Sequence, residues 1–208
     1  MQALFIHGMG RSPLSGLPVL WQLKRAGLKT STFGYVVSLE GFLAIRKRLV
    51  SKILMLAAQE DYVLIGHSLG GVLLRAAVNS LPPGINPPRR IFLLGSPFQP
   101  ARLAQKLHGN LIYRVLTRDC GQLLGSPTRM AEIGPVSVPT TSIAGVRGGL
   151  PSKRGPFRGE LNDGLVSISE VSAEWITDQV RIPIVHTFLP SCKRVAEIIL
   201  ERVARNEV

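Results

Sequence analysis

A serine flanked by glycines carries the most chemical information in the sequence. Ser68 lies in Gly66-His67-Ser68-Leu69-Gly70-Gly71, a G-x-S-x-G pattern between the apolar runs Asp61–Ile65 and Val72–Asn79. Between a strand and a helix, this pattern places a serine hydroxyl on a strained turn above a sheet. The free N–H groups and the positive dipole end of the following helix then face the reacting centre. We therefore predict that Ser68 is a nucleophile.

A second glycine-containing turn follows the first apolar run, Gln2–Ile6. It reads His7-Gly8-Met9-Gly10, and its glycines allow backbone N–H groups to approach an oxyanion. If both turns leave the carboxyl edge of one parallel sheet, they lie side by side. We predict an oxyanion hole made by the backbone N–H groups of Met9 and Leu69.

A nucleophilic serine needs a general base, and the chain has four histidines. His186 follows the apolar run Val180–Val185 and precedes the last helix, which puts it on the same sheet edge as Ser68. An imidazole, with a usual pKa of about 6.5, suits a proton shuttle. His186 is the predicted base. The others are interpreted as a structural residue (His67), a brace for the oxyanion loop (His7) and a solvated side chain (His108).

The acid that orients the base is expected between Ser68 and His186 in the chain. Asp163 is the predicted acid because it lies in the turn Asn162-Asp163-Gly164-Leu165-Val166, which can hold a short carboxylate toward an imidazole. Asp163 could instead satisfy only its own turn. Glu160 and Glu170 are the reserve candidates; the interval also contains Asp119, Glu132, Glu174 and Asp178.

The elements that must position these residues alternate between strand and helix. The predicted strands are short and continuously apolar, which is typical of a parallel sheet covered on both faces. The sequence predicts an α/β fold with a mostly parallel central sheet, helices on both faces and a single domain over residues 1–208. The expected strands are Gln2–Ile6, Lys29–Val37, Asp61–Ile65, Arg90–Leu94, Thr140–Val146 and Val180–Val185. The expected helices are Leu14–Ala26, Leu39–Ala58, Val72–Asn79, Arg102–Arg118 and Cys192–Asn206, with Gly121–Pro135 irregular.

The composition excludes several classes of protein. Hydrophobic residues make up 45% and charged residues 18%, so the chain can bury a core and is not intrinsically disordered. No apolar run approaches the roughly 18 residues of a membrane span. Met1–Ile6 lacks the features of a targeting segment, which leads us to expect a cytoplasmic address. Cys120 and Cys192 lie outside metal-ligand spacing, so we expect no metal site. They could form one disulfide, but we expect two buried or idle thiols.

The formal net charge of +12 predicts attraction to anionic surfaces. The cations are scattered along the chain and no aromatic residues interleave with them, so we expect no nucleic-acid function. Transient contact with an anionic membrane surface is compatible with the charge. The cationic loop Arg147–Arg158 could receive a phosphate head group or an acidic substrate, or could be simply solvated.

With these residues in place, the sequence resembles an α/β-hydrolase, and within that superfamily the small bacterial lipases and esterases. The resemblance runs from about Ala3 to Leu200. It implies Ser68 as nucleophile, Asp163 as acid and His186 as base, in a cofactor-free mechanism through an acyl-enzyme. The implied partner is a small-molecule ester or lipid, either a carboxylic ester or an acylglycerol. The same residues would serve an acyltransferase or thioesterase; a non-catalytic protein that binds anionic lipid or nucleic acid is the remaining alternative.

The stretch Pro97–Pro139 is longer than the smallest members of that family need. Insertions at this point of the family often form a lid, so the resemblance implies a partial cap over about residues 97–139. The side chains expected near the acyl pocket are Leu103, Leu107, Leu111, Ile112, Tyr113 and Leu116. The alternative is the ordinary packing of an extra helix.

Overall fold

The computed structural model describes residues 1–149 and 155–205. Its centre is a six-stranded sheet in the order β2-β1-β3-β4-β5-β6, and every neighbouring pair is parallel. The strands are β1 (Gln2–Ile6), β2 (Lys29–Phe33), β3 (Tyr62–His67), β4 (Arg90–Leu94), β5 (Thr140–Gly145) and β6 (Asp178–Ile182). The predicted α/β fold class is therefore confirmed.

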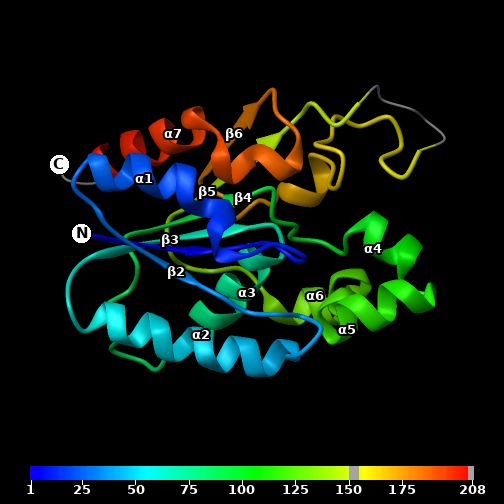
Figure 1. Cartoon of the computed structure of the whole chain (residues 1–208), viewed down its shortest axis with the longest axis horizontal. Helices are drawn as coiled ribbons and strands as arrows, with labels where there is room; N and C mark the ends of the chain where they lie inside the picture. The colour runs from blue at the N-terminus through cyan, green and yellow to red at the C-terminus, as the bar shows by residue number, and fades with distance from the viewer. Residues whose placement is uncertain (150–154, 206–208) are drawn as a thin grey trace.

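Helices cover both faces of the sheet (Figure 1). α1 and α7 lie on one face, and α2 and α3 lie on the other. Short 3-10 helices, η1 (Pro13–Gly16), η2 (Ser169–Val171) and η3 (His186–Ser191), occupy three of the connections. The α-helices are α1 (Leu17–Arg25), α2 (Phe42–Ala57), α3 (Leu69–Val78), α4 (Arg102–Leu107), α5 (Leu111–Gly125), α6 (Pro127–Ile133) and α7 (Lys193–Ala204). Within the two described stretches, no helix has both the length and the hydropathy of a membrane span.

The strands β1, β3 and β4 are mostly apolar because both of their faces are buried, whereas the equally buried β5 begins with Thr140, Thr141 and Ser142. Along β1, Ala3 and Phe5 pack into the core under α1 and α7, while Leu4 and Ile6 pack into the core under α2 and α3. In a strand, successive side chains point to opposite faces, so hydrophobic residues are favoured on both sides of a strand between two helical layers. This preference explains why the sequence shows continuous apolar runs.

Several boundaries differ from the sequence expectations. β2 ends at Phe33, whereas β3 continues to His67 because that residue still pairs with Leu94 of β4. β6 starts at Asp178 and ends at Ile182, where a tight turn hydrogen bonds the Ile184 N–H to the Ile182 carbonyl at 2.8 Å. The predicted strand over residues 180–185 was therefore placed too late in the chain.

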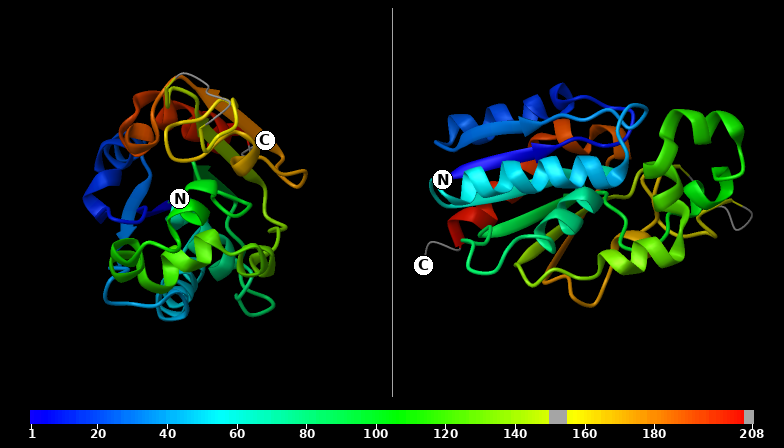
Figure 2. Two further views of the ribbon diagram at one scale, coloured as in Figure 1. Left: turned by 90° about the vertical axis from the view of Figure 1, so that its right-hand side faces the viewer. Right: turned by 90° about the horizontal axis from the view of Figure 1, so that it is seen from below.

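The segment 97–139 contains three helices that lie beyond the carboxyl ends of the strands (Figures 1 and 2). The expectation that Gly121–Pro135 is irregular was wrong, since α5 continues to Gly125 and α6 follows at once. The Ser126 hydroxyl accepts the Arg129 N–H at 3.4 Å, and Pro127 occupies the first turn of α6. A side-chain cap followed by proline restarts a helix at this point.

Helix α3 holds both ends of this segment. The buried Arg75 guanidinium donates to the Pro97 carbonyl at 3.1 Å and to the Gly134 carbonyl at 3.2 Å. Asn79, one turn later, donates its amide to the Ile133 carbonyl at 2.6 Å. Because α3 also begins directly after Ser68, the base of the segment and the predicted nucleophile share one rigid element. In the sequence, the only signal for this anchor is a single arginine inside an apolar helix.

Candidate active site

Ser68 lies on a strained turn between β3 and α3. Its φ is 53° and its ψ is −123°, a conformation that costs energy in a residue with a side chain. The Ser68 N–H donates to the Leu94 carbonyl at 2.9 Å, which fixes the turn against the end of β4. A Cβ on Gly66 would lie 2.5 Å from the Gly71 Cα, so the turn cannot close with a larger residue there. The geometry is that of a serine held above the edge of a sheet.

The turn after β1 packs directly against this serine. A Cβ on Gly70 would lie 2.4 Å from the Ile6 carbonyl oxygen, and one on Gly8 would lie 3.1 Å from the Ser68 Cβ. Met9 therefore reaches the same pocket as Ser68. Leu69 is the first residue of α3, and the first N–H groups of a helix have no intrahelical acceptor.

Asp163 and His186 form a buried pair. The Asp163 Oδ2 lies 2.6 Å from the His186 Nδ1, and both residues are at most 3% exposed. The Asp163 Oδ1 accepts the N–H groups of Leu165 and Val166 at 3.0 and 2.9 Å. The His186 N–H in turn donates to the Asp163 carbonyl at 2.9 Å. The carboxylate satisfies its own turn and contacts the imidazole at the same time, so the two interpretations of the sequence are not exclusive.

The end of β4 lies between this pair and Ser68. A Cβ on Gly95 would lie 2.9 Å from the His186 Nδ1 and 3.0 Å from the Asp163 Oδ2, and the preceding Leu94 holds the Ser68 N–H. Among the described residues no hydrogen bond joins the Ser68 Oγ to the His186 Nε2. That nitrogen is buried and has no partner there, which is uncommon for a buried polar atom. The imidazole therefore has one nitrogen fixed and one available.

His67 has a closer relation to the candidate base than the sequence indicated. Its ring centroid is 4.8 Å from that of His186, and its Nε2 lies 3.1 Å from the His186 carbonyl oxygen. Burial, and then the neighbouring His186, hold the pKa of His67 well below its usual value. A neutral ring can donate its Nε2–H to that carbonyl, so His67 helps to hold the backbone of His186. The position of His67 next to Ser68 in the chain does not indicate this contact, which joins residues 119 positions apart.

His7 braces the loop after β1, as expected. Its ring stacks on Tyr35 with centroids 4.2 Å apart, and its Nδ1 lies 2.8 Å from the Gly8 carbonyl oxygen. The Tyr35 N–H donates to its Nε2 at 3.3 Å. Burial lowers the pKa of His7, which fits a neutral ring with one donor and one acceptor nitrogen. His108 is exposed.

The two reserve carboxylates hold a different part of the structure. The buried Glu170 accepts the Ser167 N–H and the Arg102 N–H, each at 2.7 Å. The Arg102 guanidinium lies 2.9 Å from Glu160. These bonds tie the start of α4 to the loop that carries Asp163. Within the described chain, neither carboxylate contacts His186.

A small apolar pocket opens beside Ser68. Its volume is about 220 Å³. Three of the six side chains expected near an acyl pocket line it, namely Leu103, Leu107 and Tyr113. The other three do not line it; they lie on the outer side of α5, where Leu111, Ile112 and Leu116 are 60–71% exposed. The remaining lining residues are Met9, Pro97, Ala101, Ala104, Leu124, Leu165 and Val166.

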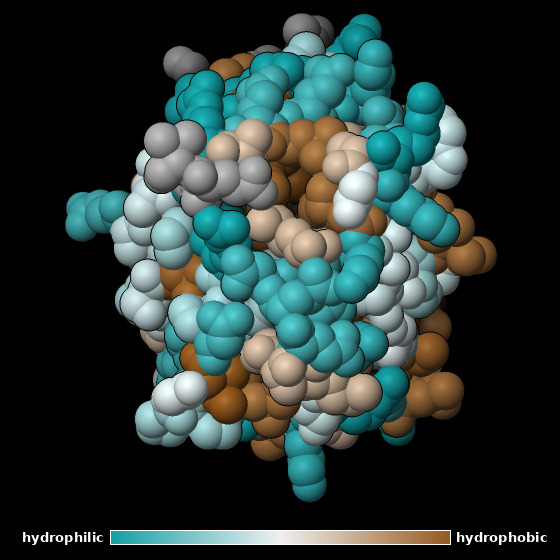
Figure 3. Space-filling view, turned by 90° about the vertical axis from the view of Figure 1, so that its left-hand side faces the viewer, coloured by the Kyte–Doolittle hydropathy of each residue, from teal (hydrophilic) through white to brown (hydrophobic). Residues whose placement is uncertain are grey.

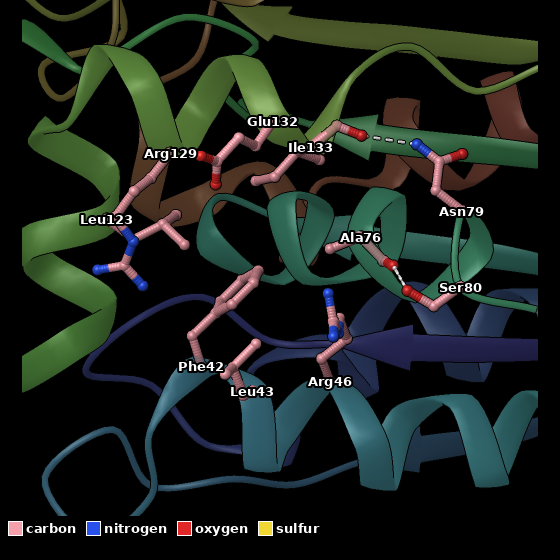
Figure 4. Close-up of a pocket in the computed structure, with 10 residues that line it drawn as sticks. All are labelled: Phe42, Leu43, Arg46, Ala76, Asn79, Ser80, Leu123, Arg129, Glu132 and Ile133. Atoms are coloured by element: carbon pink, nitrogen blue, oxygen red, sulfur yellow. Dashed lines mark hydrogen bonds between the residues drawn. The ribbon is translucent and has the colours of Figure 1, made fainter.

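A larger cavity, of about 440 Å³, lies elsewhere, between α2, α3 and α6 (Figure 4). It is lined by apolar and charged side chains but does not include Ser68. Its Arg129 is paired with Asp119 at 2.8 Å. Leu123 lines this cavity and the adjacent Leu124 lines the pocket beside Ser68, so α5 separates the two. Cavity size alone therefore does not select the candidate site, which is chosen here by the position of Ser68.

Of the cationic loop Arg147–Arg158, residues 150–154 lie outside the described residues. The Arg147 and Gly148 N–H groups donate to the carbonyls of Ile184 and Asn162 at 3.2 and 2.8 Å, beside the Asp163 turn. Cys120 and Cys192 are both free thiols, as expected.

No known family model and no curated protein sequence matches the chain. Solved structures do. A lipase of Bacillus licheniformis in its mature form superposes with a TM-score of 0.74 and 14% identity, covering 97% of this chain and 91% of the lipase. A metagenomic carboxyl esterase superposes with a TM-score of 0.72 and 16% identity, covering 100% of this chain and 76% of the esterase.

A thioesterase from the prodiginine pathway of Streptomyces coelicolor gives a TM-score of 0.63 and 14% identity, covering 99% of this chain and 85% of the thioesterase. All three are hydrolases that share the parallel sheet with helices on both faces. At this identity the likeness concerns the fold. The chain has the fold of the α/β-hydrolase superfamily.

Proposed function

We propose that the protein is a serine hydrolase that cleaves carboxylic esters or acylglycerols through an acyl-enzyme. One observation carries the proposal: the His186 imidazole is held by a buried carboxylate at Nδ1 and has a buried, unpartnered Nε2 among the described residues. An unsatisfied buried nitrogen destabilises a fold. In a serine hydrolase this nitrogen accepts the proton of the reacting serine hydroxyl.

In this mechanism His186 takes the proton of Ser68 while the hydroxyl oxygen attacks an ester carbonyl. His186 then protonates the leaving alcohol, and water repeats the steps in reverse to release the carboxylic acid. Asp163 keeps the proton on Nδ1, so that Nε2 can accept, and stabilises the imidazolium that forms. No cofactor or metal is needed for these steps.

The proposed oxyanion donors are the backbone N–H groups of Met9 and Leu69. Both residues flank Ser68, one through the pocket and one as its chain neighbour. The N-terminus of α3 adds a favourable field at the same point. One donor of this kind contributes about 3 kcal/mol to transition-state stabilisation.

The acyl group would occupy the apolar pocket of about 220 Å³ beside Ser68. Its small volume favours short acyl chains. We propose that residues 97–139 act as a partial cap, because Leu103, Leu107 and Tyr113 from α4 and α5 form one wall of this pocket. Arg75, which bonds to Pro97 and Gly134, would hold the two ends of that cap in place.

Thioester hydrolysis or acyl transfer is the second candidate, favoured by the likeness to a thioesterase. Both reactions use the same serine, base and oxyanion donors. A panel of nitrophenyl esters and acyl-thioesters of increasing chain length separates ester hydrolysis from thioester hydrolysis, since the preferred leaving group differs. Higher kcat/KM for thioesters would favour the second candidate.

A fluorophosphonate probe tests the nucleophile directly. Wild type should be labelled and Ser68→Ala should not, whereas Ser51→Ala, which removes an exposed serine on α2, should label like wild type. Equal labelling of wild type and Ser68→Ala would reject Ser68 as the nucleophile. No labelling and no turnover of any ester would favour a non-catalytic binding protein.

A further inference from the structure

Helix α5 exposes an apolar face to solvent. Its first two turns contain four large apolar residues that are 60–71% exposed: Leu111, Ile112, Val115 and Leu116. Residues four apart on a helix are neighbours, so these side chains form two adjoining pairs. We call the four residues the α5 face. Contiguous exposed apolar side chains of this kind mark contact sites.

The backbone holds the α5 face away from the body of the protein. α5 bends at Arg118, whose φ is 44°. After the bend the helix is buried through Cys120, Leu123 and Leu124. The Arg118 guanidinium donates to the Ser38 carbonyl at 2.9 Å, which fixes the bend. A positive φ in arginine costs conformational energy, and this bend directs two apolar turns outward.

The α5 face does not belong to the substrate pocket. Tyr113, on the inner side of the same two turns, lines the pocket beside Ser68, and none of the four α5-face residues does. The two sides of one short helix thus have different surroundings. The α5 face is therefore available to contact a binding partner outside the protein.

The charges beside the α5 face indicate an anionic occupant. A shallow groove of about 460 Å³ is lined by Leu111 and Val115 together with Arg114 and Arg118. The segment 97–139 contains five Lys or Arg and only two acidic residues, and the whole chain carries +12. A second copy of this chain would bring the same positive charge to the contact, which disfavours self-association. Apolar side chains flanked by arginine suit a surface with acyl chains under negative head groups.

The opposite end of the molecule differs from the cap. Hydrophilic side chains cover most of it, although a hydrophobic hollow and smaller hydrophobic patches are visible (Figure 3). Helix α5 lies at the other end, beyond the carboxyl ends of the strands (Figures 1 and 2), and it carries the four exposed residues of the α5 face. The active-site pocket is at that same end.

We propose that the α5 face docks on an anionic lipid bilayer, with Leu111, Ile112, Val115 and Leu116 inserted among the acyl chains and Arg114 contacting the head groups. The proposal rests on the proposed function only in that a docked cap would bring the Ser68 pocket to a lipid substrate. Docking itself needs no catalysis and is measured without it.

The test uses the full chain with Ser68→Ala, floated with vesicles of phosphatidylcholine alone or with about a third phosphatidylglycerol. We expect binding to the anionic vesicles and at least tenfold weaker binding to the neutral ones. Ile112→Ser/Leu116→Ser should weaken anionic binding by at least tenfold. Arg114→Gln should weaken it by roughly fivefold, the effect of one cation near such a surface.

Two control variants distinguish docking through the α5 face from nonspecific binding to the vesicles. Met55→Ser removes a side chain of α2 that is 60% exposed, as Leu116 is, and Lys47→Gln removes an exposed cation of α2. Both should bind anionic vesicles within about twofold of the parent. Thermal melting should show that the α5 variants remain folded.

The outcomes decide the proposal. Absence of binding to anionic vesicles, or binding that the α5 variants leave unchanged, would overturn it. A concentration-dependent dimer that Ile112→Ser/Leu116→Ser abolishes would also overturn it, in favour of a second copy as occupant.

A separate assay tests the proposed function. Ile112→Ser/Leu116→Ser, in a chain that keeps Ser68, should turn over a soluble short nitrophenyl ester at the wild-type rate. If wild type itself does not turn over this ester, the proposed function is contradicted while the docking proposal stands.

Discussion

Replacement of Asp163 by asparagine tests the proposed mechanism most sharply, because the structure dictates which way the amide must face. The Asp163 Oδ1 accepts two backbone N–H groups, from Leu165 and Val166. Only the amide oxygen of asparagine can replace it there. The amide NH₂ then takes the place of Oδ2, 2.6 Å from the His186 Nδ1.

An NH₂ group cannot accept the Nδ1–H of His186. The imidazole must shift its proton to Nε2 so that Nδ1 can accept from the amide, and Nε2 then cannot take the Ser68 proton. In a serine hydrolase this wrong tautomer lowers kcat by about 10⁴. At 1.36 kcal/mol per factor of ten, the loss is about 5.4 kcal/mol of transition-state stabilisation.

The assay is kcat and KM for a soluble nitrophenyl ester, with Glu160→Gln as the matched control. Glu160 is bonded to Arg102 and not to His186, so its amide variant should keep kcat within about threefold of wild type. KM should change little in Asp163→Asn, since the carboxylate does not line the pocket. A kcat for Asp163→Asn within tenfold of wild type would refute the assignment of Asp163 as the orienting acid.

Three further predictions concern the framework of the site. Gly70→Ala should lower the free energy of unfolding by about 3 kcal/mol or more, because the new Cβ would lie 2.4 Å from a β1 carbonyl oxygen. In the control Gly109→Ala, the new Cβ meets nothing within 4 Å, so the free energy of unfolding should stay within about 0.5 kcal/mol of wild type. Urea titration measures both changes. Arg75→Met should lower the free energy of unfolding by about 2–4 kcal/mol in the same titration, since one buried and one part-buried carbonyl lose their donor. A change near zero would show that the ends of the segment 97–139 are held by other contacts. Hydrogen bonds from Ser169 and Arg102 lower the pKa of Glu160 to about 2. The excess in free energy of unfolding of wild type over Glu160→Gln should therefore be complete above about pH 5 and should decline as the pH falls toward 2. An excess that grows on acidification would contradict this prediction.

The fold could be predicted from the sequence because its signals are local. A strand buried on both faces favours a continuous apolar run, so Gln2–Ile6 and Arg90–Leu94 were predicted with the observed boundaries. The end of the edge strand β2 was predicted less well, because the strand is mostly polar and half-exposed and its residues do not mark where pairing stops. The G-x-S-x-G turn is likewise local, since the glycines and the strained serine lie within six residues.

The contacts that make the candidate site depend on tertiary structure. His186 Nδ1 meets Asp163 across 23 residues, and His67 meets the His186 carbonyl across 119. Sequence order suggested Asp163 but left Glu160 and Glu170 open, because any of these carboxylates lies on a segment able to reach the sheet edge. Only the packing of the loop decided among them: Arg102 holds Glu160, and the start of α4 holds Glu170.

The sequence by itself determined the order of the six strands, the position of the serine turn and the excess of positive charge, since each follows from residue type and near neighbours. The tertiary structure alone decided which carboxylate contacts the imidazole, that α3 anchors the segment 97–139 near both of its ends through Arg75, and that α5 turns Leu111 and Ile112 outward. Those outcomes depend on how distant segments pack, and side-chain packing is a property of the assembled chain that no local pattern specifies.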